Sequence, residues 1–357
     1  MKWFDDPYCQ YVTVRRFMLQ MAMYVQHLAT GSTLLCQCIK VGTIRVYLRQ
    51  VIGFFMRFGR WKRNPCFAAT SDSYCDELKS VLAEQTRWEK VPRRREPFTP
   101  EMLTSMYSDD YGYIEHDSCF ASCRDQFGAG TYDGRRKTEC CQEAGQSDPS
   151  CPKKDQYGDT KAFTLGDVTW VLDNNTTLVG ASALLYPRSR VKRAKICWRT
   201  QKNGQNGEER SFTSPDDETN LSWISFTYSI VQRFVRLCGA DDYTTPLSVY
   251  KADDGSVKLL TSTDVEKVMR QVAAHVYKLD PTTESGQKQL QLWSCHSIRV
   301  GACVLLHSRG FTDTQIQWIL RWRSMAFLVY LRNIDVLCDK HVQAFNAALE
   351  GMPNIVI

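Results

Sequence analysis

The chain has 357 residues, 43% of them hydrophobic and 24% charged, which is typical of a globular protein with room for two domains. No apolar run approaches the roughly 20 residues that a membrane-spanning helix needs, so we expect no membrane partner. The first residues lack the basic-then-apolar profile of a secretion signal, which indicates a reducing compartment. We therefore expect neither a transmembrane protein nor a disulfide-rich secreted one.

Cysteine is abundant, but the 15 residues form no recognisable disulfide framework, and we expect most of them to be buried free thiols. Zinc binding is the alternative for a group of possible ligands between residues 116 and 151. No pair in this group has the Cys-x2-Cys spacing that lets neighbouring thiolates share one tetrahedral ion. We therefore expect neither a metal nor another cofactor. The group comprises His116, Cys119, Cys123, Cys140, Cys141 and Cys151.

Positive charge is concentrated in the first part of the chain. Residues 1–95 carry 16 Lys and Arg against 7 Asp and Glu, whereas the remaining residues carry 29 against 32. No carboxylate lies between Pro7 and Ser71, although an ordinary solvated surface mixes both signs of charge. We therefore expect a polyanion against this surface, and double-stranded DNA is the usual candidate. The expected DNA contacts here are Lys40, Arg45, Arg49, Arg57, Arg60, Lys62 and Arg63.

The first 90 residues (1–90) predict a small helical domain. Segments 12–28 and 43–58 place apolar residues three and four apart with basic residues between them, and 71–88 predicts a further helix. A basic helix lying on a membrane surface is the alternative interpretation. Residues 91–98 form a basic, proline-containing linker, and its Arg93, Arg94 and Arg95 join the expected DNA contacts.

Residues 99–357 predict a mainly α domain that carries a small antiparallel β-sheet. Alternating residues predict strands at 163–172, 190–200 and 208–213, with a further element at 178–185. Two Asn-Gly dipeptides between 203 and 207 predict a tight turn, because Asn and Gly tolerate positive φ. Residues 108–130 give no clear pattern, and 146–161 predict a loop. Helices are expected at 101–107, around 134–143, and at 228–237, 263–277, 294–307, 313–321 and 324–333.

Two short patterns near the C-terminus carry chemically useful side chains. His296 and Arg299 are three residues apart, so a helix places them on one face. Trp322 ends one predicted helix, and Tyr330 lies inside the next. Each pattern alone fits ordinary helix packing, and only their combination indicates a site.

This combination resembles the tyrosine recombinase and phage integrase superfamily. Ser294-Cys-His-Ser-Ile-Arg-Val-Gly-Ala302 is similar to the matching part of Cre-type enzymes. Arg321-Trp-Arg-Ser-Met-Ala-Phe-Leu-Val-Tyr330 looks most like the recombinases of Crypton and DIRS-like eukaryotic mobile elements. Gly134-Arg-Arg-Lys-Thr-Glu139 resembles the family's Gly-x-Arg-x-Ser-Glu helix, and residues 200–207 resemble its lysine-bearing hairpin. Residues 40–48 are similar to its helical core-binding domain, which clamps DNA.

The resemblance implies a set of fixed donors around one DNA phosphate. Arg136 and Arg299 are expected to bind the phosphate oxygens bidentately through the transition state, with Glu139 as the supporting acid. His296 and Trp322 are expected to add hydrogen bonds to the phosphate or to the nucleophile. Guanidinium groups stay charged at any relevant pH, so this chemistry requires no metal ion.

The remaining roles implied by the resemblance belong to a nucleophile and an acid. Tyr330 is expected to attack the phosphate and form a 3′-phosphotyrosine, while Lys202 protonates the leaving 5′-oxygen. The polar Asp133 before the Gly-Arg pair departs from the family pattern. Arg135 is therefore the alternative to Arg136 as the first arginine.

The resemblance also implies partners and a location. The expected partner is double-stranded DNA, bound by a homotetramer on paired sites that is a monomer when free. The expected location is the nucleus for a eukaryotic element, and otherwise the cytoplasm or nucleoid. The sequence leaves three alternatives: a DNA-binding descendant that has lost catalysis, a type IB topoisomerase-like enzyme, and a structural module in which these residues only pack.

Overall fold

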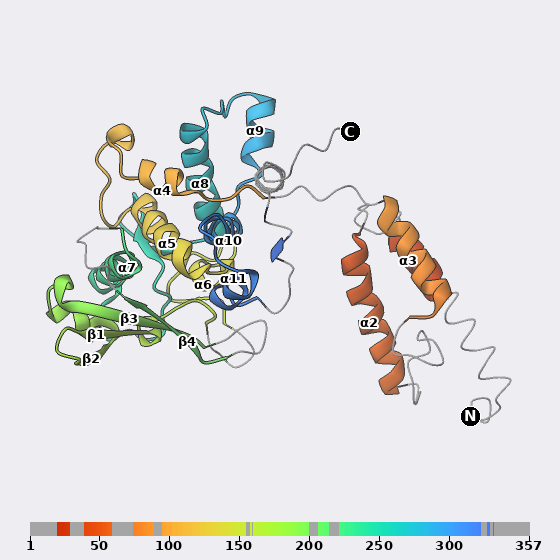
Figure 1. Cartoon of the computed structure of the whole chain (residues 1–357), viewed down its shortest axis with the longest axis horizontal. Helices are drawn as coiled ribbons and strands as arrows, with labels where there is room; N and C mark the ends of the chain where they lie inside the picture. The colour runs from red at the N-terminus through yellow and green to blue at the C-terminus, as the bar shows by residue number, and fades with distance from the viewer. Residues whose placement is uncertain are drawn as a thin grey trace, which may run out of the picture. The chain divides into compact units, whose positions relative to one another are not determined.

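A computed structural model of the chain describes residues 20–28, 39–58, 74–88, 95–154, 158, 160–199, 206–213, 221–322, 327–328 and 331. The chain divides into two compact units, Met1–Pro92 and Arg93–Ile357 (Figure 1). The division falls inside the segment 91–98 that the sequence predicts as a linker. Within the described residues, no helix combines the length and the apolar character needed to cross a membrane.

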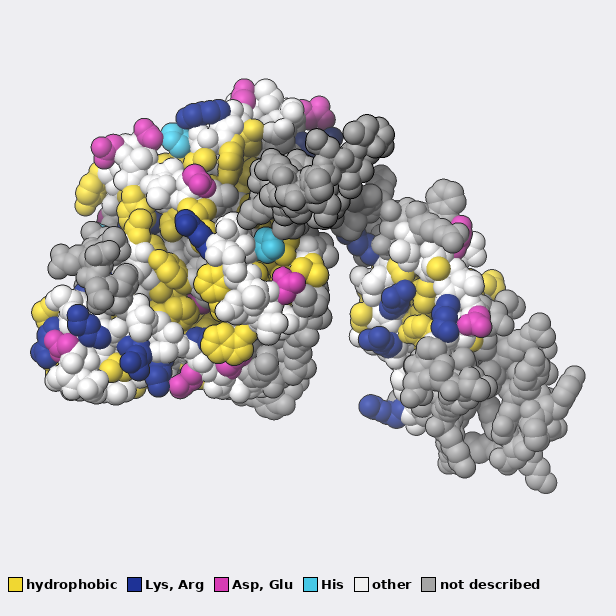
Figure 2. Space-filling view, in the orientation of Figure 1, with side chains coloured by type: hydrophobic (Ala, Val, Ile, Leu, Met, Phe, Trp, Pro, Cys, Tyr) yellow, Lys and Arg dark blue, Asp and Glu magenta, His cyan; other side chains and the backbone are white. Residues whose placement is uncertain are grey.

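The N-terminal unit is helical in the part that the structure describes. It contains α2 (Val41–Phe58), α3 (Asp76–Trp88) and helical residues 20–28. On α2 a buried stripe of Val41, Ile44, Leu48 and Ile52 faces a small apolar core, because residues three and four apart share one face of a helix. Basic side chains lie on the visible face of this unit (Figure 2). Of the expected DNA contacts, Lys40, Arg45, Arg49, Arg57 and Arg95 are exposed, while Arg60, Lys62, Arg63, Arg93 and Arg94 lie outside the described residues.

The second unit contains the predicted small antiparallel sheet. Its strands are β1 (Val168–Leu172), β2 (Thr177–Val179), β3 (Val191–Trp198) and β4 (Glu208–Thr213), in the spatial order β2-β1-β3-β4. Inward residues stand opposite one another across the sheet, as in the register Trp170–Ala194–Phe212. A two-stranded sheet of β5 (Val249–Lys251) and β6 (Val257–Leu259) was not predicted. The fold class, mainly α with a small antiparallel sheet, is confirmed.

The predicted strand 163–172 is too long at its start. Residues Leu165–Asp167 form a 3-10 turn, because the Asp167 carboxylate accepts hydrogen bonds from the N–H and the hydroxyl of Thr164 at 2.7 and 3.2 Å. Local hydrogen bonding of this kind competes with a strand. The predicted element 178–185 is likewise the end of β2 followed by a 3-10 helix, Gly180–Leu185.

Helices make up the rest of this unit. α7 lies against β3 and β4, and Figure 1 shows the other helices on the same side of the four-stranded sheet. Phe212 of β4 stacks on Trp223 of α7, with ring centroids 4.3 Å apart. The helices are α4 (Pro100–Ser105), α5 (Cys119–Asp133), α6 (Lys137–Cys140), α7 (Trp223–Cys238), α8 (Ser262–Val276), α9 (Glu284–Leu290), α10 (Ser297–Ser308) and α11 (Asp313–Ile319).

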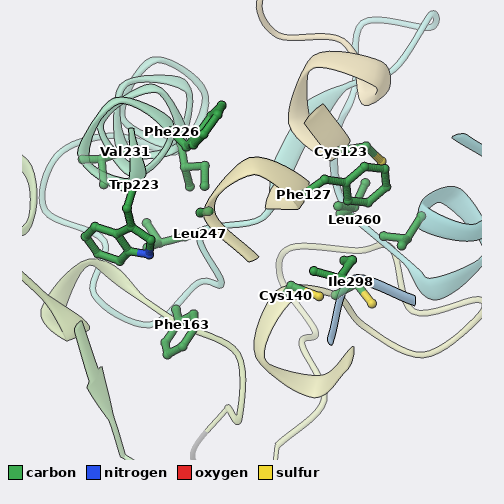
Figure 3. Packing of buried hydrophobic residues seen from close by; sticks show 14 of the residues in the cluster. Cys123, Phe127, Cys140, Phe163, Trp223, Phe226, Val231, Leu247, Leu260 and Ile298 are labelled. Carbon is green, nitrogen blue, oxygen red and sulfur yellow. The ribbon is translucent and has the colours of Figure 1, made fainter. Parts of the chain in front are cut away.

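The central helix α5 is the element that the sequence pattern does not reveal. It packs against α7, α8 and α10, and its residues are buried on nearly every side. A helix surrounded in this way has no polar face, so it shows no amphipathic stripe. Figure 3 shows Phe127 of α5 among Cys140, Leu260 and Ile298. Its start is fixed by the Ser118 hydroxyl, which accepts from the Ala121 N–H at 3.2 Å.

Close packing between α5 and α10 requires a glycine. A Cβ added to Gly130 would lie 2.6 Å from Cγ2 of Ile298, and the Ile298 side chain is buried in the core. Since Ile298 immediately precedes Arg299, this contact helps to set the position of the helix that carries the predicted phosphate-binding residue.

We predict that Gly130→Ala destabilises this unit. Overpacking of a buried contact costs about 1–3 kcal/mol, which exceeds the roughly 1 kcal/mol that alanine gains over glycine inside a helix. Urea denaturation followed by circular dichroism measures the change in the free energy of unfolding. Gly166→Ala is the control, because its Cβ would meet its nearest neighbour, Cδ1 of Tyr243, at an ordinary 3.6 Å. Equal stability of both variants would contradict the packing argument.

Candidate active site

The two candidate first arginines diverge after α5. Gly134 ends α5 with a left-handed φ of 57° and is not part of a helix, so the predicted helix around 134–143 is reduced to the short α6. Arg135 then lies in the core, 2% exposed, where its Nη2 donates to Oδ2 of Asp133 at 2.6 Å. Asp133, which the sequence left unexplained, also accepts from the indole N–H of Trp223 at 3.0 Å. Arg135 and Asp133 therefore form a structural ion pair.

Arg136 lies in a different environment. Its side chain is 22% exposed, and its Nη2 donates to the backbone oxygen of Arg321 at 3.5 Å. Its Nη1 lies 3.6 Å from Oε1 of Glu139. Burial lowers the pKa of the Arg136 guanidinium, and the neighbouring positive charge of Arg321 lowers it further. The structure thus brings Arg136, and not Arg135, to the cluster described next.

Glu139 is the centre of this cluster. Its two carboxylate oxygens accept from Nη1 and Nη2 of Arg321 at 3.0 and 3.1 Å, and Oε2 also accepts from the backbone N–H of Arg136 at 2.7 Å. The side chain is 3% exposed. Glu139 therefore connects α6 to the turn that follows α11. Its role as the supporting acid stays a prediction. Arg321 is a residue that sequence reasoning missed.

Arg299 reaches the same turn from α10. Its Nη1 donates to the backbone oxygen of Gly134 at 2.7 Å, and its Nη2 donates to the backbone oxygen of Leu320. Leu320 and Arg321 are consecutive, so their Cα atoms lie only about 3.8 Å apart. Arg136 and Arg299 are therefore held on two successive carbonyl groups of one turn.

Trp322 and His296 complete the described part of the cluster. The Arg299 guanidinium carbon lies 4.5 Å from the centroid of the Trp322 ring. His296 is the residue before α10 and is half-buried. Burial lowers the pKa of its imidazole, and the positive charges of Arg299 and Arg95 lower it further. The imidazole is consequently neutral at pH 7.

The described part of the cluster is rich in arginine. Arg210 of β4 extends it, because its Nη2 pairs with Glu208 and also donates to the backbone oxygen of Trp318 at 2.8 Å. Four guanidinium groups thus accompany two carboxylates. The four are Arg136, Arg210, Arg299 and Arg321; the two are Glu139 and Glu208.

Two predicted site residues, Lys202 and Tyr330, lie outside the described residues. Lys202 belongs to the segment between β3 and β4, and β3 ends at Trp198, whose ring lies 3.9 Å from the Arg321 guanidinium carbon. Tyr330 stands just before Leu331, which packs with Phe327 in a small core beside α10 and α11. The predicted helix 324–333 also lies largely outside the described part of the chain.

The cysteines of the predicted zinc alternative come from different elements of the fold. Cys119 and Cys123 belong to α5, whereas Cys140 and Cys141 lie at the end of α6. Among the described residues, no group of three or more His, Cys, Asp or Glu side chains has an arrangement that could hold a metal ion. Burial raises the pKa of Cys123, which keeps this thiol protonated.

Comparisons with known proteins find similarity only among solved structures. No family model matches the sequence, and none of the curated proteins does. The Tn1549 transposon integrase in complex with circular intermediate DNA is 14% identical, covers 92% of this chain and 86% of its own, and has a TM-score of 0.42. The XerH site-specific recombinase bound to its difH substrate is 13% identical, with coverages of 92% and 72% and a TM-score of 0.47. A lambda integrase dimer bound to a core site is 11% identical, with coverages of 89% and 80% and a TM-score of 0.42.

We predict that His296 titrates below its ordinary pKa of 6.5. Desolvation and two cationic neighbours all oppose the imidazolium form. Its contribution to stability is therefore present above pH 6.5 and is lost as the pH falls below that value, because the unfolded chain then binds the proton more readily. NMR titration of the imidazole carbon-bound protons, assigned with His296→Gln, measures the midpoint.

Arg95→Gln should raise this midpoint because it removes one of the opposing charges, whereas Arg309→Gln, at the exposed end of α10, should leave it unchanged. A His296 midpoint at or above 6.5 in the parent protein would contradict the assignment of its surroundings.

Proposed function

We propose that this chain is a tyrosine recombinase, a site-specific enzyme that cuts and rejoins DNA strands through a protein-bound phosphotyrosine. One observation carries the proposal: Arg136 and Arg299, far apart in sequence, are held on the successive carbonyl groups of Leu320 and Arg321, next to Trp322. Guanidinium groups that are fixed in this way suit a phosphate diester, because they bind its oxygens through charge-assisted, paired hydrogen bonds.

The geometry supports a division of labour around that phosphate. In the transition state negative charge develops on the two non-bridging oxygens, and fixed guanidinium donors stabilise it without reorganisation. Arg136 and Arg299 fill this role. His296, neutral at pH 7, accepts a proton from the attacking hydroxyl, since a group must be unprotonated to act as a base.

Tyr330 and Lys202 supply the two remaining parts of the reaction. The Tyr330 oxygen forms the bond to phosphorus, the bond from phosphorus to the 5′-oxygen breaks, and Lys202 gives that oxygen its proton. The reverse attack by a 5′-hydroxyl restores the DNA backbone. The bond energy is kept in the phosphotyrosine, so no nucleotide cofactor is consumed.

The setting of this activity is part of the proposal. The exposed basic residues of α2 bind the backbone of double-stranded DNA, and four copies assemble on two paired sites from a monomer in solution. The terminal motif favours a eukaryotic mobile element of the Crypton or DIRS-like kind and hence a nuclear location.

We predict a covalent protein–DNA adduct that forms without divalent metal. Duplexes that the protein retains from a random-sequence pool are nicked at successive positions, end-labelled and incubated with the protein in EDTA. A nick beside the cleavage site lets a short fragment leave, so religation fails and the phosphotyrosine accumulates. Denaturing gel electrophoresis in SDS then detects the labelled adduct.

Tyr330→Phe should abolish the adduct while DNA affinity changes less than about twofold, because only the nucleophilic oxygen is removed. Tyr113→Phe is the matched control, since Tyr113 is 93% exposed and outside the cluster. An adduct that survives in Tyr330→Phe would place the nucleophile elsewhere. Binding without any adduct would favour a DNA-binding protein that has lost catalysis, and relaxation of plasmid DNA without strand exchange would favour a topoisomerase.

We also predict that Arg45 and Arg49 of α2 contact DNA phosphates. Each phosphate contact contributes about 0.9 to the slope of log affinity against log salt, so Arg45→Ala combined with Arg49→Ala should lower that slope by about 1.8. Fluorescence anisotropy with a labelled duplex at several salt concentrations measures it. Gln50→Ala, an exposed neutral position on the same helix, should leave the slope unchanged. An unaltered slope in the double variant would show that this face does not bind DNA.

A further inference from the structure

Arg321 is a buried arginine to which neither the sequence motifs nor the proposed reaction gives a role. It follows α11 with a φ of 56°, in the left-handed region, and its side chain is 0% exposed. This backbone conformation costs a non-glycine residue roughly 1–2 kcal/mol. A strained residue that also buries a charge persists only where its surroundings over-determine it.

The surroundings hold Arg321 from three sides. Its two terminal nitrogens form a fork on the Glu139 carboxylate, at 3.0 and 3.1 Å. Nη2 also lies 3.4 Å from the backbone oxygen of Asp133, at the end of α5. Its guanidinium carbon lies 3.9 Å from the ring centroid of Trp198, the last residue of β3. The side chain therefore ties α6, α5 and the sheet to one turn.

That turn also accepts hydrogen bonds from the two phosphate-binding candidates, Arg136 and Arg299. The Arg321 oxygen accepts from Arg136, the Leu320 oxygen accepts from Arg299, and the next residue, Trp322, contacts Arg299. A movement of the turn moves both carbonyl groups together. Any change in the Arg321 side chain is thus transmitted to both guanidinium groups at once.

We propose that Arg321 is a positioning residue of the recombinase site: its fork on Glu139 holds the turn 320–322, whose carbonyl groups orient Arg136 and Arg299 toward one phosphate. This inference rests on the proposed function. Arg321 does not touch DNA in this arrangement, because its side chain is sealed between Glu139 and Trp198. It acts through the residues that it holds.

The variant Arg321→Gly distinguishes the role of the side chain from that of the left-handed backbone conformation. Glycine adopts a left-handed conformation without strain, so a residue needed only to make the turn is replaced without loss. A residue that is needed for its two-pronged contact with Glu139 cannot be replaced by glycine without loss. We expect adduct formation under single-turnover conditions to slow on the order of a hundredfold, the effect of misplacing reacting groups by about an ångström, while DNA affinity changes less than about twofold.

Two further variants test the route of the effect. Arg321→Lys keeps the charge but cannot form a two-pronged contact, so its rate should fall between those of the parent and of Arg321→Gly. Glu139→Gln combined with Arg321→Gly should be no slower than Glu139→Gln alone, because residues that act as one unit are not additive. Arg309→Gly, at the exposed C-terminal end of α10, controls for the loss of one positive charge.

A readout that does not depend on catalysis keeps this inference separate from the proposed function. The backbone N–H of Trp322 donates to the backbone oxygen of Gln317 at 2.9 Å, and the hydrogen exchange of this amide reports whether the turn is held. Exchange at Trp322 should accelerate in Arg321→Gly while amides in the middle of α5 keep their protection.

The outcomes are distinct. A parent protein that forms no adduct through Tyr330 overturns the proposed function, and the exchange experiment still decides whether Arg321 holds the turn. A parent that forms the adduct, together with an Arg321→Gly variant that cleaves equally fast, overturns the positioning role and leaves the proposed function standing. Unchanged hydrogen exchange at the Trp322 amide in Arg321→Gly also overturns the positioning role of Arg321.

Discussion

The buried carboxylate of Glu139 is the interaction on which the candidate site depends. It accepts the guanidinium fork of Arg321 and the backbone N–H of Arg136, and so joins two segments that are 182 residues apart. Removing one partner of such a pair leaves an uncompensated buried charge, at a cost of about 3–5 kcal/mol. The pair is therefore formed or broken as a unit. The position of α6 and the position of the turn after α11 consequently depend on each other.

Arg135, Arg136 and Arg299 differ in the groups that their guanidinium nitrogens contact. Arg135 forms a buried ion pair with Asp133, and this pair stabilises the end of α5 inside the core. The guanidinium group of Arg299 donates to the backbone oxygens of Gly134 and Leu320, which orient it. Arg136 shares Glu139 with Arg321. The structure thus fixes the orientation of both Arg136 and Arg299, a property that a phosphate-binding site requires.

Three titratable neighbours of the cluster are uncharged at pH 7. Burial raises the pKa of the Cys303 thiol on α10 to about 12, and the pKa of Cys141 after α6 is also raised, by hydrogen bonds to Cys140 and Cys295. These thiols stay protonated and fill space without adding negative charge. His296 is neutral for the opposite reason, because burial and two arginines disfavour its cationic form. These three groups consequently add no charge to the cluster at pH 7.

The sequence by itself determined the features that depend on near neighbours in the chain. The amphipathic helices α2, α7 and α8 and the strands β3 and β4 follow from local periodicity, which reflects an element that has one buried and one exposed side. The placement of His296 and Arg299 three residues apart, at the start of α10, is local as well. Tertiary structure decided the rest. The helix α5 is surrounded by other elements and has no exposed polar face, so its sequence shows no amphipathic pattern. The choice between Arg135 and Arg136, and the part played by Arg321, depend on which carboxylate each guanidinium group meets. An ion pair across 182 residues leaves no periodic trace in the sequence, because its geometry exists only after the helices and the sheet have packed.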